Sequence, residues 1–483
     1  MNLRLLLSAL VLTLSLQGCA TPMLQSTEVD RAQGEEAARM VAEQMGIIEA
    51  PDLTGYIERV GGRMVDELDK RLFSYTFRIV DQQEPNAFSV PGGQVFVSRG
   101  LLALVMTEDE LASVLAHEVM HVERRHSAKQ QARQRLPQLL TLPGNVVGSV
   151  VSRDLGAVMM MPGALVGATM GARYSRGHEF EADELGQTLA ATAGYDPNAL
   201  VAILNRIEAQ VELATGSTSG PHFFDTHPTT DRRATELSVR AESLAWTQRT
   251  AEAGRPGAAM DELRGLIVGK NPAHGVFRDQ AFLHPDMGFT LEFPAEWEPI
   301  NTPMVVGAVA PSRDAAIVIM AESVDANAEQ VGASFVQALT KEHRVTPERA
   351  EPVQIGEWPG YLITLADRSG RRAAYLHLLW VDTDQALLRL TGAGSETHQD
   401  ALRQAAKSLR PLRKEERASI TRTVLDIAEA REGESLERLG RRTGNVWDLR
   451  QTVVANDLDP DARLRRGHRV KIAIEVPFFV SER

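Results

Sequence analysis

Two histidines four residues apart, in the run His117 to His121, limit most strongly how this part of the chain can fold. The run reads His-Glu-Val-Met-His. Residues 107–110 read Thr-Glu-Asp-Glu, a capping box typical of a helix start, and an apolar stretch follows directly. These signals predict a helix over about residues 108–125. Residues four positions apart lie on one helix face, so both imidazoles would point to the same side.

This arrangement is suited to metal chemistry. Two imidazoles on one helix face can bind one cation, and a glutamate beside the first can act on water at that ion. His117 and His121 are therefore candidate ligands, and Glu118 is a candidate general base. The chain has a single cysteine, Cys19, which excludes a thiolate zinc site, an iron–sulfur cluster and an internal disulfide. Any metal must be held by histidine, aspartate or glutamate.

A second stretch, residues 175–183, offers the carboxylates that such a site needs. Glu179 and Asp183 are again four positions apart, so one can bind metal while the other holds a ligand imidazole from behind. Spacing alone does not choose between Glu179 and Glu181, and His178 is a further candidate. A catalytic zinc needs three protein ligands and one open position, and this stretch would complete that set.

A third stretch, residues 226–233, begins Thr-His-Pro. A His-Pro pair at a helix start is a weak signal, and by itself it favours a structural role for His227. Upstream, residues 75–80 alternate as a strand does, and two short apolar runs flank the Pro-Gly-Gly of residues 91–93. The second pattern predicts a β-hairpin.

An ordered set of motifs runs through about residues 29–246. It consists of Asn86-Ala87-Phe88, Pro91-Gly92-Gly93, Gly100-Leu101-Leu102, Glu110-Leu111-Ala112, His117-Glu118-x-x-His121, Arg125-His126 and Glu179-x-x-x-Asp183. This set resembles the HtpX/CAAX-prenyl-protease/BepA family of gluzincin-type zinc metallopeptidases. The resemblance implies a mainly helical, zincin-like peptidase domain with a small sheet.

The resemblance also implies roles for individual residues. One Zn²⁺ per chain would be held by His117, His121 and Glu179. Asp183 would hold a ligand imidazole in place without binding the metal itself. Glu118 would take a proton from water and deliver one to the leaving amine.

Further implied roles concern the substrate. His227 would either occupy the fourth zinc position or assist catalysis. Arg233, with neighbouring Arg232 as the alternative, would steady the substrate or the developing oxyanion. The strand at Asn86, Ala87 and Phe88 resembles the zincin edge strand, on which a substrate binds as an added strand with loose sequence specificity.

The N-terminal residues have the pattern of a targeting signal. Residues 1–18 have a positive charge followed by an apolar run, which predicts a secretory signal peptide. The end of that segment and Cys19 resemble the bacterial lipoprotein box, which implies a lipidated cysteine and a durable membrane anchor. The residue after the cysteine is Ala20 and not an aspartate. By resemblance to the enterobacterial sorting rule for lipoproteins, this favours the outer membrane. We therefore expect a periplasmic protein anchored to the inner leaflet of the outer membrane.

The expected fold class is multidomain α+β, and 483 residues leave room for about three domains. The expected segments are a signal peptide (1–18), a tether (19–27), the peptidase domain (28–253), a linker (254–275), an α+β domain of unknown role (276–412) and a small LysM-like module (413–483). The apolar stretch 139–171 is interrupted by Arg153 and Asp154. We interpret it as a loop or amphipathic helices near the active site, with membrane-surface contact as the minority interpretation.

The last segment has the pattern of a βααβ unit. Residues 432–444 and 456–472 resemble the start and end of a LysM module, a type that binds glycans containing N-acetylglucosamine, such as peptidoglycan. Glu434 stands where aspartate is common, and a single copy binds weakly without avidity. A structural or protein-docking module is the other interpretation.

The net charge argues against a nucleic-acid-binding protein. The chain has 52 Lys and Arg against 64 Asp and Glu, a net charge of −12, so no nucleic-acid partner is expected.

The sequence predicts a zinc endopeptidase that degrades misfolded or stalled envelope proteins. The alternatives are a chaperone-like outer-membrane assembly factor with a mostly closed zinc site, and a peptidoglycan-binding scaffold. Expected partners are unfolded or misassembled envelope proteins and the membrane, with peptidoglycan and the outer-membrane assembly machinery as further candidates.

Overall fold

The computed structural model describes residues 25–130, 174–215, 227, 231–249, 255, 257, 259–301, 305–322, 324–368 and 373–479. The expected signal peptide, Cys19 and the apolar stretch 139–171 lie outside these residues. Within the described part of the chain, no helix is long and apolar enough to cross a membrane.

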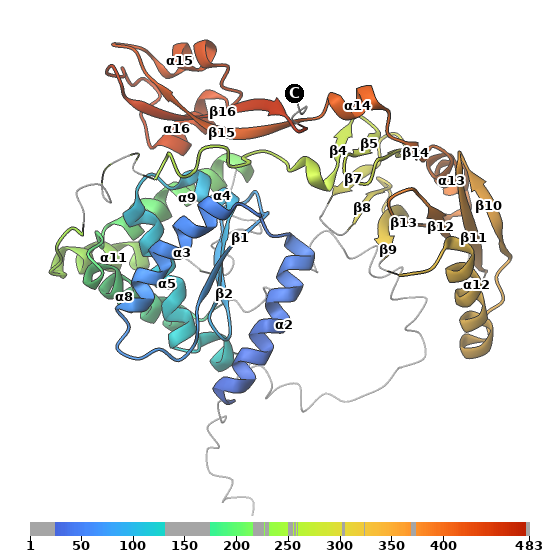
Figure 1. Ribbon diagram of the computed structural model, residues 1–483, viewed down its shortest axis with the longest axis horizontal. Coiled ribbons are helices and arrows are strands. Elements are labelled where there is room, and N and C mark those ends of the chain that lie inside the picture. Colours follow the sequence, from blue (N-terminus) through green and yellow to red (C-terminus); the bar gives the residue numbers. More distant parts are fainter. Residues whose placement is uncertain are drawn as a thin grey trace, which may run out of the picture.

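The first part of the chain folds as a small sheet surrounded by helices (Figure 1). Its elements are α2 (Thr27–Met45), α3 (Pro51–Asp66), β1 (Thr76–Val80), β2 (Ala87–Val90), β3 (Gln94–Ser98), α4 (Arg99–Leu104), α5 (Glu108–Glu123), α8 (Arg176–Thr192), α9 (Ala199–Thr215) and α11 (Asp231–Ser243). The strand order is β1-β3-β2, with β1 parallel and β2 antiparallel to β3. The predicted hairpin is therefore confirmed, and β2 is an edge strand.

Local signals explain the start of α5, with one correction. The Thr107 side chain accepts a hydrogen bond from the Glu110 amide at 3.2 Å, as an N-cap does. The reciprocal half of the predicted capping box is wrong. The Glu110 carboxylate instead accepts from the Met106 amide at 2.7 Å and pairs with Arg206 at 2.8 Å. A buried guanidinium competes successfully for that carboxylate, because an unpaired buried charge is costly.

The apolar run of α5 is at the centre of this domain's core. Leu111, Val114 and Leu115 are essentially inaccessible to solvent and pack in one cluster with α3, α9 and the sheet. Burial of each side chain contributes about 1.5–3 kcal/mol. The helix that carries both histidines is thereby fixed in position.

The middle of the chain, drawn yellow to orange in Figure 1, is an antiparallel α+β unit. Its elements are η1 (Pro272–His274), β4 (Val276–Arg278), β5 (Ala281–His284), β6 (Phe289–Glu292), β7 (Glu298–Asn301), β8 (Val306–Val309), β9 (Ala315–Glu322), α12 (Ala328–Ala338), η2 (Leu339–His343), β10 (Arg349–Ile355), β11 (Trp358–Asp367), β12 (Ala374–Asp382), β13 (Leu387–Ser395), η3 (Glu396–His398), α13 (Gln399–Lys407) and β14 (Arg410–Pro411). The larger sheet has the order β10-β11-β12-β13-β9-β8-β7. Helix α12 packs on one face of this sheet and α13 packs on the other.

The last part of the chain has the order strand, helix, helix, strand. Its elements are α14 (Lys414–Ala418), β15 (Thr421–Glu429), α15 (Leu436–Thr443), α16 (Leu449–Asn456) and β16 (Arg469–Pro477). β15 and β16 pair antiparallel along their whole length. A cluster that includes Leu436, Leu439 and Leu464 forms the unit's own small core.

This C-terminal unit, red in Figure 1, packs on the first domain rather than extending beyond the second. Leu425 and Ile427 of β15 belong to the same hydrophobic core as α5. The Nζ atom of Lys471 is fully buried and donates to the carbonyls of Ala103 and Val105 at 2.7 and 3.1 Å. Residues 259–268, within the expected linker, are part of this contact: Met260, Leu263 and Leu266 are buried, and the Leu425 amide donates to the Leu266 carbonyl.

Candidate metal centre

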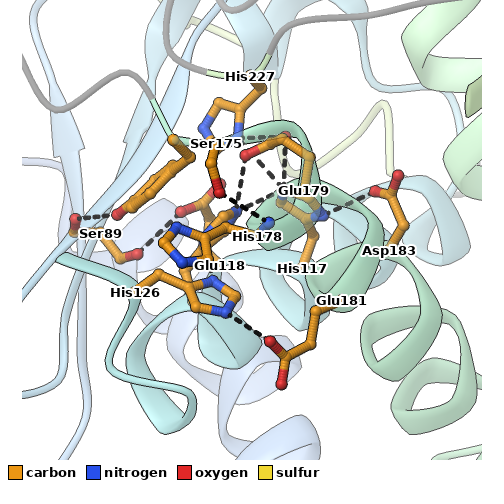
Figure 2. Close-up of polar contacts among 12 residues, drawn as sticks. Ser89, His117, Glu118, His126, Ser175, His178, Glu179, Glu181, Asp183 and His227 are labelled. Carbon is orange, nitrogen blue, oxygen red and sulfur yellow. Dashed lines mark hydrogen bonds and ion pairs between the residues drawn. The ribbon is translucent and has the colours of Figure 1, made fainter. Parts of the chain in front are cut away.

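Four buried side chains converge between α5 and α8 (Figure 2). His117 and His121 come from α5, Glu179 comes from α8, and His227 precedes α11. One ligand atom from each lies within 4.8 Å of the ligand atoms of the others. All four residues are 1% exposed or less. The structure thus brings together the three predicted ligands and the predicted fourth residue, from three stretches of sequence.

His117 is held from behind by a carboxylate. Its Nδ1 atom lies 3.0 Å from Asp183 Oδ1, while its Nε2 atom faces the cluster. Arg233 in turn grips Asp183 with two hydrogen bonds of 2.6 and 2.8 Å. Burial would raise the pKa of Asp183, but His117 and the charge of Arg233 outweigh it and hold that pKa below its usual value. A proton on Nδ1 leaves the Nε2 lone pair of His117 directed into the cluster.

His121 meets His117 inside the cluster. Their Nε2 atoms are 3.0 Å apart, and His121 Nε2 is 3.4 Å from Glu179 Oε1. Burial lowers the pKa of His121 to about 3, so this imidazole is neutral at physiological pH. The Oε1 atom of Glu179 has no hydrogen-bond partner among the described residues. Two imidazole nitrogens and a carboxylate oxygen, all buried and convergent, are a donor set that suits zinc.

Glu118 is fully buried beside this cluster. Its Oε2 atom accepts a hydrogen bond from Ser89 Oγ at 3.0 Å, and its Oε1 atom lies 3.4 Å from His227 Nε2. Sequence reasoning missed Ser89. The alternation of side chains along β2 was an available signal, because it places Ser89 on the face toward α5, opposite Phe88.

The predicted substrate-binding residues lie at the edge strand β2 and just before it, but their side chains point into the protein. Asn86, Ala87 and Phe88 are all buried, and the Phe88 ring stacks on Phe96 with centroids 5.1 Å apart. An extended peptide at this edge would therefore meet the backbone of β2.

Arg233 does not lie apart from the ligands, as a residue reserved for substrate would. Besides Asp183, its guanidinium contacts Glu179 Oε2 at 3.0 Å and the His227 carbonyl at 3.2 Å. It therefore ties the carboxylate of α8 to the segment that carries His227. The side chain of Arg232 lies outside the described part of the chain.

Glu181 and His178, the other two candidate metal ligands, lie outside the cluster. Glu181, whose side chain is 37% exposed, points to His126 at 3.2 Å, and the ring of His178 stacks on that of His126 at 4.4 Å. Tyr174, which the sequence did not single out, stacks on His121 at 4.0 Å. Neither stacking contact has a signature in sequence spacing, because both depend on how α5 and α8 cross.

Gly186 sets the distance between α5 and α8. A Cβ atom added there would lie 3.0 Å from His117 Cα and 3.1 Å from His117 N, both backbone atoms that cannot move independently. We expect Gly186→Ala to destabilise the protein by about 1–3 kcal/mol through this overpacking. Gly62→Ala on α3, where a Cβ meets nothing within 4 Å, should instead stabilise by about 0.5–1 kcal/mol. Thermal unfolding of the two variants checks this, and equal midpoints would contradict it.

Comparison with known proteins gives the following similarities. A family model described as Peptidase family M48 matches residues 51–241. A beta-barrel assembly-enhancing protease of Yersinia pestis is 31% identical over 223 residues, which are 45% of each chain. The Escherichia coli protein of the same name is 28% identical over 236 residues, 48% of each chain.

A eukaryotic relative is similar over a slightly shorter length. The mitochondrial metalloendopeptidase OMA1 of Schizosaccharomyces pombe is 30% identical over 215 residues, 44% of this chain and 61% of that protein. The chain therefore spans less than half the length of the two bacterial relatives and less than two thirds of the yeast protein.

Proposed function

We propose that the chain is a zinc-dependent endopeptidase that degrades misfolded or stalled envelope proteins. The match of residues 51–241 to the model of peptidase family M48 supports this proposal. One observation carries the proposal: four buried ligand atoms converge within 4.8 Å, with the buried carboxylate of Glu118 beside them. Buried polar groups without a purpose are costly, so the cluster is best explained by a bound cation.

In this proposal His117, His121 and Glu179 hold one Zn²⁺, and Asp183 orients His117. A zinc ion held there would act as a Lewis acid, polarising a peptide carbonyl and making a nearby water more acidic. Arg233 keeps Glu179 and Asp183 in place through its contacts with both. A guanidinium with several partners suits that task better than direct contact with substrate.

Glu118 carries the protons. Its carboxylate takes one from the attacking water and later delivers one to the leaving amine. Ser89 Oγ, 3.0 Å from Oε2, fixes the orientation of that carboxylate. Because Ser89 belongs to β2, the same strand would orient both the base and an extended substrate. Recognition through backbone hydrogen bonds implies loose sequence preference.

The cellular setting is also a proposal. Two relatives carry the name beta-barrel assembly-enhancing protease, which supports a role in the bacterial envelope and near the outer-membrane assembly machinery. Residues 1–18 and Cys19 support export to the periplasm and a lipid anchor in the outer membrane. The strand-helix-helix-strand order at residues 421–477 supports a LysM-like module. Peptidoglycan is its proposed ligand because the modules that it resembles bind such glycans.

A second candidate function has its own observation. His227 Nδ1 lies 3.2 Å from both His117 Nε2 and Glu179 Oε2, so this side chain fills the space beside the ligands. A site closed by His227 fits a chaperone-like assembly factor with little basal proteolysis. The same geometry fits an endopeptidase that is opened by its substrates.

One experiment tests the site and the role of His227 together. The soluble form that begins at Ala20 should contain one zinc per chain and cleave casein, and a chelator should abolish cleavage. His227→Ala should keep zinc and cleave casein several-fold faster, because the space beside the ligands is opened. Absence of zinc from the wild type would contradict the proposed function. Zinc without cleavage in either form would favour the chaperone-like factor, and slower cleavage by the variant would assign His227 to catalysis.

A further inference from the structure

The two histidines of α5 are supported in different ways. Behind His117 stands the carboxylate of Asp183, in direct contact. Behind His121 stands another imidazole: the Nδ1 atoms of His121 and His126 are 2.9 Å apart. The Nε2 atom of His126 is in turn 3.2 Å from Glu181 Oε2. Figure 2 shows the contact between His126 and Glu181 below the cluster, apart from Asp183 at the right.

The contacts allow one consistent set of protons. An ionised carboxylate only accepts hydrogen bonds, so Glu181 places the proton of a neutral His126 on Nε2. His126 Nδ1 is then an acceptor, so His121 carries its proton on Nδ1 and donates it to His126. The partners thus select the tautomer of His121 that leaves Nε2 free for the cluster.

The backbone is shaped to place His126 there. Arg125, directly before it, has a φ of 53°, a left-handed conformation that is uncommon for a residue other than glycine. This residue follows the end of α5. Its guanidinium donates to Asp30 Oδ2 at 2.6 Å and to the Gln25 carbonyl. Strained conformations persist where the surrounding structure determines them, often at functional sites.

We propose that His126 is a positioning residue for His121: it fixes the ring and tautomer of this zinc ligand and connects it to the carboxylate of Glu181. The inference deepens the proposed function and rests on it. His126 is fully buried, between the rings of His178 and Tyr174, so it cannot reach a substrate directly. The partners behind a ligand imidazole typically change metal affinity about 10–100-fold.

Two substitutions separate this role from packing. His126→Leu keeps a branched side chain of similar reach and removes the acceptor. His126→Asn keeps an acceptor oxygen near the position of Nδ1. Zinc affinity, measured by competition with a chromophoric chelator, should fall about 10–100-fold in the leucine variant and stay within about threefold of wild type in the asparagine variant.

A matched pair tests the far end of the chain. Glu181→Gln should weaken zinc binding by a few-fold, because the charge is lost while an acceptor oxygen remains. Glu184→Gln makes the same change on the same helix, at an exposed residue whose ion pair is with Arg240, and should have no effect.

The outcomes are distinct. A wild type that binds zinc and a leucine variant that binds it equally well would overturn this inference alone. So would equal losses in the leucine and asparagine variants, which would reduce His126 to packing. A wild type without zinc would overturn the proposed function itself.

Discussion

Replacing Glu118 with glutamine should lower casein cleavage by about 10²–10⁴-fold while zinc content stays at one per chain. Glutamine has the same shape and still accepts the hydrogen bond from Ser89 Oγ, so the local structure is preserved. It cannot accept a proton from water. Zinc content by metal analysis and casein degradation by the soluble form measure both halves of the prediction.

Two further variants of this kind make the result specific. Glu123→Gln, on the same helix, removes a carboxylate that contacts Tyr75 and lies away from the ligands, and it should leave zinc content unchanged. Glu179→Gln removes a ligand oxygen and should lower zinc content as well as cleavage. A Glu118→Gln protein that retains more than a tenth of wild-type cleavage would exclude Glu118 as the base.

Deleting residues 413–483 should unfold or insolubilise the first domain rather than release it intact. Leu425 and Ile427 lie in the core that contains α5, and together they contribute about 3–6 kcal/mol. The deletion also removes Lys471, and the buried carbonyls of Ala103 and Val105 then lose their hydrogen-bond donor. Losses of this size are comparable with the whole stability of a typical domain.

Two point variants distinguish the core shared with α5 from the small core of the C-terminal unit. Leu425→Ala, in the core shared with α5, should lower stability by about 2–5 kcal/mol and reduce zinc binding at elevated temperature. Leu436→Ala, in the small core of the C-terminal unit, should affect that unit first. Thermal unfolding followed together with zinc release distinguishes them. A truncated protein that stays folded, binds zinc and unfolds at the wild-type temperature would contradict the shared core.

The shared core also bears on the scaffold hypothesis. A tail that only bound peptidoglycan would need no contact with the first domain. Here Arg206 of α9 contacts Asp457 at 3.3 Å and Glu110 of α5 at 2.8 Å. The C-terminal unit is thus connected by charge to the start of the helix that carries His117. Loss of activity on deletion would consequently report on folding as well as on any glycan binding.

Several elements were predictable because their signals are local. The helix around residues 108–123, the helix after Ser175 and the hairpin around residues 91–93 follow from caps, periodicity and turn residues. The strand order β1-β3-β2, with its parallel pair, has no local signal, because pairing depends on contacts between distant segments. The path of the C-terminal unit back to the first domain has none either.

The candidate site divides in the same way. Spacing by itself determined that His117 and His121 share a helix face with Glu118 beside them, because a helix of 3.6 residues per turn makes that a local property. Spacing did not choose between Glu179 and Glu181; the family resemblance implied Glu179, and the tertiary structure places Glu179 against the histidines. Only it placed Ser89, His126 and Arg233 where they hold the reactive groups. Those contacts join residues on different elements, so their geometry is set by how the helices and the sheet pack against one another.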